Sequence, residues 1–196
     1  MKRKQTVAPV TEPISLFEAR LHLRVDEHDV EDTAIDEIIK AAVAEAEKFQ
    51  NRAYITQTWE FYPEAGDVRR GCVKIPLPPL QSVSAVAYRT VAGAWVTLTA
   101  DSDYFVDAVS DPGLVVFSDD FVLPGNADLW PILPIKITAV VGYGAPEDVP
   151  SSVRQALLLL IGHFYENREA VVAGSIVNYL PYGAKNLLNR DRVIPT

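Results

Sequence analysis

The sequence predicts an α+β protein, a small helical bundle with an inserted antiparallel β subdomain. Residues 150–169, PSSVRQALLLLIGHFYENRE, repeat apolar side chains at the three- and four-residue steps of a helix. Residues 34–51 show the same period, whereas residues 56–144 alternate apolar and polar in the manner of strands. Since both ends of the alternating region return to helical sequence, we expect an insertion and not a free domain.

The first part of the chain predicts an arm followed by two helices. Residues 1–13 are polar, contain two prolines and lack periodicity, so we expect a flexible arm. Ser15 and Glu18 have the capping-box spacing, which predicts a short helix over about residues 16–23. An acidic turn at 26–32 precedes a long amphipathic helix that ends near Asn51. The predicted helical domain comprises residues 14–55 and 145–196.

Four acidic residues crowd the start of the long helix: Glu31, Asp32, Asp36 and Glu37. The helix macrodipole favours negative charge at this end, which is a sufficient structural reason for them. A metal or catalytic carboxylate cluster is the alternative, but no histidine falls at liganding spacing beside them. We therefore expect no metal site here.

Strand signals fill the predicted β subdomain, residues 56–144. The predicted strands are 58–62, 73–75, 83–88, 95–98, 114–117 and 134–143. Ala92-Gly93 marks a hairpin, and Asp111-Pro112-Gly113 marks a turn. Cys72 lies in a strand-like run and is expected to be buried. Trp130, in an irregular loop, is expected to be packed.

The segment 150–169 is the element around which the fold is expected to form. A helix this apolar must be covered on nearly every side, by other helices and by other subunits. Pro150 suits the first helical position, and Ser151 or Ser152 supplies a cap in the alternative register. A short amphipathic helix at 184–188 and a basic tail follow it.

Composition excludes several classes of protein. A formal net charge of −8 argues against a protein that mainly grips nucleic acid phosphates, although a local basic surface is compatible with it. A single cysteine excludes an internal disulfide framework and a cysteine-based zinc site. No apolar stretch approaches the roughly 20 residues that cross a bilayer, and no signal-peptide core follows Met1. We expect a soluble product made in a cytoplasm, without membrane partners.

Motifs for catalysis are absent from the sequence. The Gly142-Tyr143-Gly144 turn lacks the continuation of a phosphate-binding loop, and no Gly-x-Ser-x-Gly occurs. His163 and Glu166 are helix neighbours at three-residue spacing, but apolar residues surround His163 and favour a structural role. We therefore assign no catalytic residue, no cofactor and no metal ligand.

Two alternative functions remain open. A small hydrolase would use His163 and Glu166. A single-stranded nucleic-acid-binding module would stack bases on the aromatic residues of the β subdomain, although core packing is the better explanation for them in an acidic chain. These aromatic residues are Trp59, Tyr88, Trp95, Phe117 and Trp130.

Several segments of the sequence are informative together: LPPLQSV at 77–83, VAY at 86–88, DYFVD at 103–107, VGYG at 141–144, VP at 149–150, RQALLLL at 154–160 and HFYENRE at 163–169. In this order and spacing they resemble the head-tail connector (adaptor) proteins of long-tailed phages, prophages and gene-transfer agents. The opening LFEAR at 16–20 and the long helix after it are similar too. The resemblance extends from about residue 14 to residue 188.

The resemblance implies a structural role without catalysis. It implies a ring of identical subunits, twelvefold when docked, that lies beneath the portal protein and extends the DNA channel towards the tail. The implied partners are the portal protein, the next neck or tail-completion protein, and passing double-stranded DNA that is not bound sequence-specifically. The implied location is the neck of a virion or phage-like particle, and the bacterial host cytoplasm during assembly.

The C-terminal segment is the expected contact with a neighbouring protein. We expect residues 184–192 to reach that neighbour, with the contact made by Leu187, Leu188, Arg190 and Arg192. Family members often end in a Pro-Tyr-Arg run after the last helix, whereas this chain continues Asn-Arg-Asp-Arg-Val at 189–193.

Overall fold

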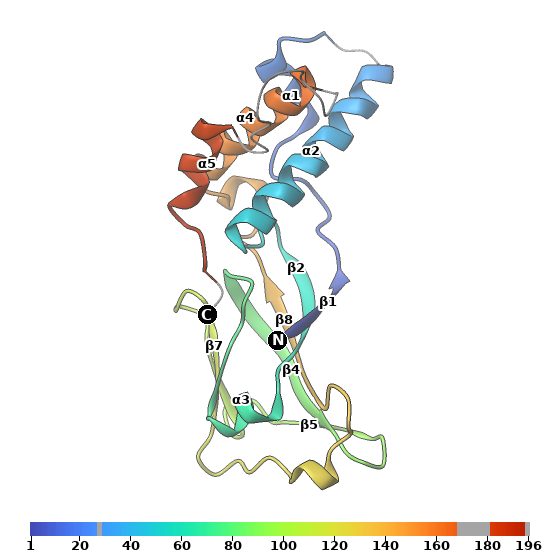
Figure 1. The fold of residues 1–196 in the computed structure, drawn as a ribbon, viewed down its shortest axis with the longest axis vertical. Coiled ribbons are helices and arrows are strands. Elements are labelled where there is room, and N and C mark those ends of the chain that lie inside the picture. Colours follow the sequence, from blue (N-terminus) through green and yellow to red (C-terminus); the bar gives the residue numbers. More distant parts are fainter. Residues whose placement is uncertain (27–28, 168–180, 195–196) are drawn as a thin grey trace, which may run out of the picture. The chain divides into compact units, whose positions relative to one another are not determined.

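The structure, a computed structural model, describes residues 1–26, 29–167 and 181–194. It is an α+β fold, as predicted, with five α-helices and two antiparallel sheets in the described residues (Figure 1). The chain forms two compact units. Met1–Pro9 and Thr56–Tyr143 form a β unit, and Val10–Ile55 and Gly144–Thr196 form a helical unit.

The helical unit contains four helices, α1 (Leu16–Leu23), α2 (Asp29–Gln50), α4 (Ser151–Glu166) and α5 (Tyr182–Asn189). Helix α4 packs against each of the other three. Its side chains Val153, Ala156, Leu157, Leu160 and Ile161 are fully buried, as the helical period predicts. Leu158 and Leu159 are only half-buried. The helix is therefore covered on one broad face and partly covered elsewhere.

The ends of the helices follow local chemistry. The capping box before α1 is confirmed, because the Glu18 amide donates to Ser15 Oγ at 3.2 Å and the Ser15 amide donates to Glu18 Oε2 at 2.9 Å. Pro150 is the cap of α4 and not its first helical residue. Helix α2 begins at Asp29, inside the segment expected to be a turn, since acidic residues in a first turn favour the helix.

The β unit contains a five-stranded sheet in the order β1-β2-β8-β4-β5 and a three-stranded sheet in the order β3-β7-β6. The strands of the first are Lys2–Val7, Gln57–Tyr62, Ile135–Val141, Leu80–Arg89 and Trp95–Thr97; those of the second are Cys72–Lys74, Leu114–Phe117 and Tyr104–Asp107. Every pairing is antiparallel. A short helix, α3 (Ala65–Arg69), lies between β2 and β3.

Strand β1 corrects the expectation of a flexible arm over residues 1–13. Lys2 pairs with Tyr62 and Lys4 with Glu60 along the edge of the five-stranded sheet. All six residues of β1 are exposed, so the sequence has no alternation of apolar and polar residues that would predict the strand. Backbone pairing to β2 holds it in place.

The central strand β8 shows how the five-stranded sheet is built. Ile135, Ile137, Ala139 and Val141 are fully buried on one face, and the residues between them are half-exposed on the other. One sheet face therefore contributes to the core of the β unit, and the opposite face is polar.

The three-stranded sheet corrects the expectation for Cys72. The Cys72 side chain is exposed, and its neighbour Val73 is buried. Cys72 pairs with Val116, and Val116 pairs with Phe105 on the far strand, so the three share one face. Phe105 is also exposed. Trp130 is half-buried, in line with the expectation of packing.

Candidate interaction surfaces

The structure places the four predicted contact residues on α5 and directly after it. Leu188 is fully buried in the helical unit and Leu187 is half-buried. Arg190 and Arg192 are exposed, and the Arg192 guanidinium lies 4.6 Å from the centre of the Phe49 ring. Of the four residues, only the two arginines are exposed.

The segment after α5 is bound to the end of α2. Gln50 Nε2 donates to the Leu188 carbonyl at 2.7 Å, Asn51 Nδ2 donates to the Val193 carbonyl at 2.9 Å, and the Arg52 side chain donates to the Asp191 carbonyl. The Val193 amide also donates to the Gln50 carbonyl at 2.9 Å. Residues 188–193 are therefore an integral part of the helical unit, and a partner would bind a surface that is already formed.

Helix α1 carries an apolar ridge, Phe17 and Leu21, that the helical unit leaves uncovered. The two side chains are 71% and 70% exposed, and their four-residue spacing places them on one side of α1. The buried side of the helix is marked by Ala19. Large exposed apolar side chains that adjoin one another are typical of protein interfaces. Sequence analysis predicted this helix but did not identify the ridge, although the four-residue spacing of Phe17 and Leu21 would have indicated it.

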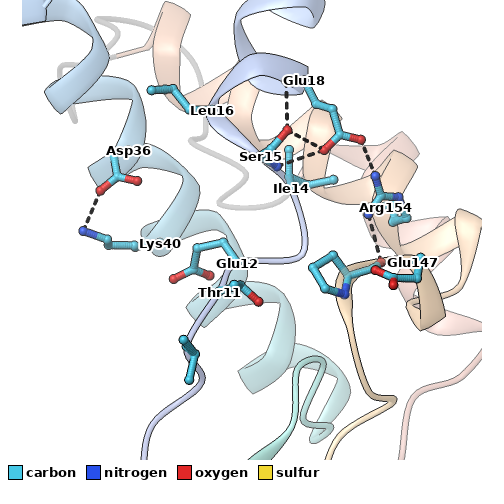
Figure 2. A pocket seen from close by; sticks show the side chains of 12 residues that line it. Thr11, Glu12, Ile14, Ser15, Leu16, Glu18, Asp36, Lys40, Glu147 and Arg154 are labelled. Carbon is cyan, nitrogen blue, oxygen red and sulfur yellow. Dashed lines mark hydrogen bonds and ion pairs between the residues drawn. The ribbon is translucent and has the colours of Figure 1, made fainter.

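An open hollow of about 610 Å³ lies in the helical unit between the segment before α1, helix α2 and the start of α4 (Figure 2). Arg154 crosses one side of it and donates to the Pro146 carbonyl at 3.0 Å, to the Pro13 carbonyl at 2.5 Å and to the Glu18 carboxylate. On the other side Lys40 pairs with Asp36 at 2.7 Å. Most of the charges in the hollow are thus paired within the chain.

The remaining charge of the hollow is acidic. Burial, and then the charge of Asp36, raise the pKa of the Glu12 carboxyl, while Lys40 opposes them. Glu147 is exposed at the rim. The hollow offers carboxylates and a backbone surface but no histidine, cysteine or activated hydroxyl, so its lining supports binding of a basic group more readily than catalysis.

His163 and Glu166 do not form a site. His163 is half-buried, its Nδ1 lies 3.2 Å from the Asn167 side-chain amide, and its ring centre is 6.0 Å from that of Phe164. Glu166 is exposed, and neither residue lines the hollow. The described residues also contain no group of three or more histidine, cysteine or acidic side chains placed to hold a metal ion.

The aromatic residues of the β unit do not form an open stacking platform. Phe117 is buried against Phe121, with ring centres 5.7 Å apart. Trp130 is half-buried under the Arg89 guanidinium, which lies 4.2 Å from its ring centre. Trp95 is exposed, but Lys136 Nζ lies 4.8 Å from the centre of its ring. Cationic side chains thus occupy positions over these rings that bases would need.

The polar face of the five-stranded sheet carries basic residues. The strand register places Lys2, Lys4 and Lys136 on one face with Glu60 and Tyr62. Lys136 Nζ lies 3.2 Å from Glu60 Oε1, and the Tyr62 hydroxyl donates to Glu60 Oε2 at 2.6 Å. The Tyr62 hydrogen bond is the largest cause that lowers the pKa of Glu60. Burial, followed by Glu60, raises the pKa of Tyr62 to about 12.

No helix among the described residues combines the length and apolar character needed to span a membrane.

Comparison with known proteins gives fold matches and no sequence match. No protein-family model and no curated protein matches the sequence. Among solved structures, a chain of the virion of a native gene transfer agent (GTA) particle is 22% identical with a TM-score of 0.77, over 100% of this chain and 97% of that one. A chain from the neck of an empty GTA particle, computed with C6 symmetry, is 22% identical with a TM-score of 0.76 over the same shares.

A third chain, from the neck of a native GTA particle computed with C12 symmetry, is 21% identical with a TM-score of 0.67 over 97% of both chains. At this level of identity the likeness shows a shared fold. It extends over both the helical unit and the β unit, because nearly the whole of each chain is covered.

Proposed function

We propose that this chain is a structural head-tail connector: a subunit of a ring in the neck of a phage or phage-like particle that joins the capsid portal to the tail. The ring is twelvefold when docked on the portal and extends the channel through which double-stranded DNA passes. The protein acts in the assembled neck, after assembly in the bacterial host cytoplasm. It performs no catalysis and needs no cofactor.

One observation carries the proposal: the fold of both units, over the full length of the chain, matches chains of GTA particles, two of them described as neck. Those neck structures were computed with C6 and C12 symmetry, which supports a ring as the form in which such a subunit works.

The surfaces of the molecule support this role better than an enzymatic one. The α1 ridge of Phe17 and Leu21 is apolar surface that a neighbouring protein can bury. The charged groups of the hollow are largely neutralised by one another, and His163 packs against Phe164. A net charge of −8 suits a channel wall along which DNA slides with weak contacts.

The portal contact is proposed for the end of α5 and the residues after it. Arg190 and Arg192 are exposed there, and Leu187 is half-buried at the same surface. Leu188 supports this surface from inside the helical unit. A deletion of residues 184–196 would therefore also remove buried packing, and point substitutions are the sharper test.

The test of the proposed function is the size of the purified full chain, with and without the portal protein of the same particle. Light scattering coupled to size exclusion is expected to show a ring-sized complex when the portal is present. A chain that stays monomeric and unbound at micromolar concentrations of portal would contradict the proposal.

The test of the portal contact is the variant Arg190→Glu/Arg192→Glu. We expect it to weaken portal binding at least tenfold, roughly what the loss of two charge-assisted contacts costs. Arg70→Glu/Lys74→Glu is the control, since both side chains are exposed, belong to the β unit and not to the tested segment, and give the same change in net charge. Equal loss in both variants would point to net charge and away from this surface.

A further inference from the structure

The charges of the β unit are segregated between its parts. The strands of the five-stranded sheet carry Lys2, Arg3, Lys4, Arg89 and Lys136 and a single acid, Glu60. In contrast, residues 90–135 contain seven aspartates and no lysine, arginine or glutamate. An acidic chain therefore has a locally basic sheet and an acidic segment within the same unit.

Within the five-stranded sheet, the accessible basic charge is concentrated on β1; Arg70 and Lys74 are exposed elsewhere in the β unit. Lys136 is held by Glu60 and Trp95, and Arg89 lies over Trp130. Lys2 and Lys4 are exposed on the outermost strand, whose second edge has no strand beside it among the described residues. An exposed edge strand with lysines is protected against random strand pairing and available for a partner of opposite charge.

Five of the seven aspartates are exposed: Asp101, Asp111, Asp119, Asp120 and Asp128. Asp103 and Asp107 are engaged locally, since Asp103 Oδ2 accepts from the Thr99 amide at 2.7 Å and Asp107 Oδ1 accepts from the Val109 amide at 2.9 Å. Asp101 precedes β6, and Asp119 and Asp120 follow β7; the carboxylates of these three make no hydrogen bond or ion pair in the described part of the chain. The Ser118 amide donates to the Asp103 carbonyl at 2.9 Å, which brings the turn with Asp119 and Asp120 beside the start of β6.

These two surfaces belong to different sheets of the β unit. β1 is an edge strand of the five-stranded sheet, and β7, which precedes the Asp119-Asp120 turn, belongs to the three-stranded sheet; in Figure 1 β7 lies to the left of β1. Two separate complementary patches on one subunit are what a head-to-tail contact requires, and such a contact closes into a ring when the rotation between subunits permits.

We propose that the basic strand β1 of one copy docks on the Asp101, Asp119 and Asp120 surface of a second copy. The proposal rests on the proposed ring and names the surfaces that join its subunits. Lys2 and Lys4 supply the cations and the aspartates supply the anions, so the contact fixes which side of one subunit meets which side of the next. Duplex DNA is a poorer occupant of β1, because the aspartates of the same unit repel phosphate.

The test uses two charge-reversed full-length chains, Lys2→Glu/Lys4→Glu and Asp119→Lys/Asp120→Lys. Each variant alone places like charges at every contact, so each is expected to assemble at least tenfold more weakly than the unaltered chain on the portal protein. A one-to-one mixture of the two is expected to regain assembly, because subunits that alternate around a ring restore opposite charges at every contact. All four positions are exposed, and matched thermal unfolding midpoints verify that each variant folds.

The outcomes separate this contact from the proposed function. If the unaltered chain forms no ring with the portal protein, the proposed function fails. If it forms a ring and both variants assemble equally well, or the mixture regains nothing, the docking of β1 on the aspartates is wrong. Loss of binding to a duplex of about 30 base pairs by Lys2→Glu/Lys4→Glu, with assembly intact, would assign β1 to DNA and overturn the proposal.

Discussion

Arg154 joins three separate parts of the helical unit. Its guanidinium contacts the carbonyls of Pro13 and Pro146 and the carboxylate of Glu18, so it links the approach to α1, the approach to α4 and α1 itself. A guanidinium presents several donors in a fixed planar arrangement, which a lysine ammonium does not reproduce. Arg154 thus positions the walls of the hollow in Figure 2.

We predict that Arg154→Ala lowers the free energy of unfolding by about 1–3 kcal/mol, because three acceptors lose a charged donor. Arg154→Lys recovers part of the loss. Urea unfolding followed by circular dichroism measures both. Gln155→Ala, an exposed neighbour on α4, is the control. An Arg154→Ala chain as stable as the control would show that the three contacts contribute nothing.

Glu18 makes the stability of the helical unit depend on pH. Burial alone would raise its pKa, but hydrogen bonds from Ser15 and the charge of Arg154 outweigh it and lower the pKa below 4.5. The folded state therefore favours the ionised carboxyl. The contribution of Glu18 to the free energy of unfolding is complete above the pKa of a carboxyl in the unfolded chain. It is lost as the pH falls through the lower pKa of Glu18 in the folded chain.

We predict that Glu18→Gln is less stable than the unaltered chain at about pH 7 and that the difference shrinks towards about pH 3. Glu12→Gln provides the contrast: the raised pKa of Glu12 means that folding disfavours its ionised form, so removal of this charge is neutral or stabilising at about pH 7. Urea midpoints across this range measure both. A difference for Glu18→Gln that is constant with pH would contradict the assignment.

Among the helices and strands, β1 is the one that its own sequence predicts least clearly. It adds an edge strand to β2 through main-chain pairing, and Gln5 Nε2 donates to Gln57 Oε1 at 2.6 Å. No β1 side chain enters the core. The strand therefore stabilises the β unit through hydrogen bonds to the backbone groups at the edge of β2, and not by burial of apolar side chains.

Deletion of residues 2–7 is predicted to destabilise the β unit, because the backbone groups of β2 that pair with β1 lose their partners. The helical signal in circular dichroism at moderate temperature is expected to persist. Lys2→Ala/Lys4→Ala is the matched control, since it removes side chains and keeps the pairing. Hydrogen exchange at the β2 amides measures the effect, and unchanged protection in the deletion would rule out a role for β1 in the sheet.

The molecule as a whole is built from two units that each use separate stretches of chain. The chain passes between them near residues 9, 55 and 143, so neither unit is a continuous segment. The helical unit presents the α1 ridge, and the β unit presents β1 and the aspartates. Each unit thus carries an exposed surface of its own.

We predict that Phe17→Ser/Leu21→Ser keeps the stability of the isolated chain and weakens assembly on the portal protein about tenfold or more, as expected when two large apolar side chains lose a buried contact. Both side chains are largely exposed in the single chain, so their removal costs little packing there. Val109→Ser, at an exposed loop position, is the control. Light scattering measures assembly. Undiminished assembly of the variant would show that the ridge is not part of the interface.

Sequence reasoning predicts the elements whose side chains enter a core. The helical period over α4, the capping box of Ser15 and Glu18, and the alternation in β8 each report burial on one face. It fails for β1 because an exposed edge strand has no such pattern. It fails for Cys72 because a three-residue strand gives too short an alternation to show which face is buried, and Val73 takes that position.

The candidate surfaces are less accessible to sequence reasoning than the fold. The contact at Arg190 and Arg192 stays a prediction, and the attachment of this segment to Gln50, Asn51 and Arg52 depends on contacts across some 140 positions in the chain. The separation of charge between β1 and the aspartates needs the order of strands in the sheets, which the spacing of residues does not contain.

The position of β8 in the sheet has a consequence for biosynthesis. β8 lies between β2 and β4, yet it is the last of the five strands to leave the ribosome. Until β8 is made, β2 and β4 each lack the strand that pairs with one of their edges in the folded protein, so backbone hydrogen-bonding groups there have no partner. A polypeptide truncated before residue 135 would therefore be prone to aggregate, and β8 supplies the missing partner to both strands at once.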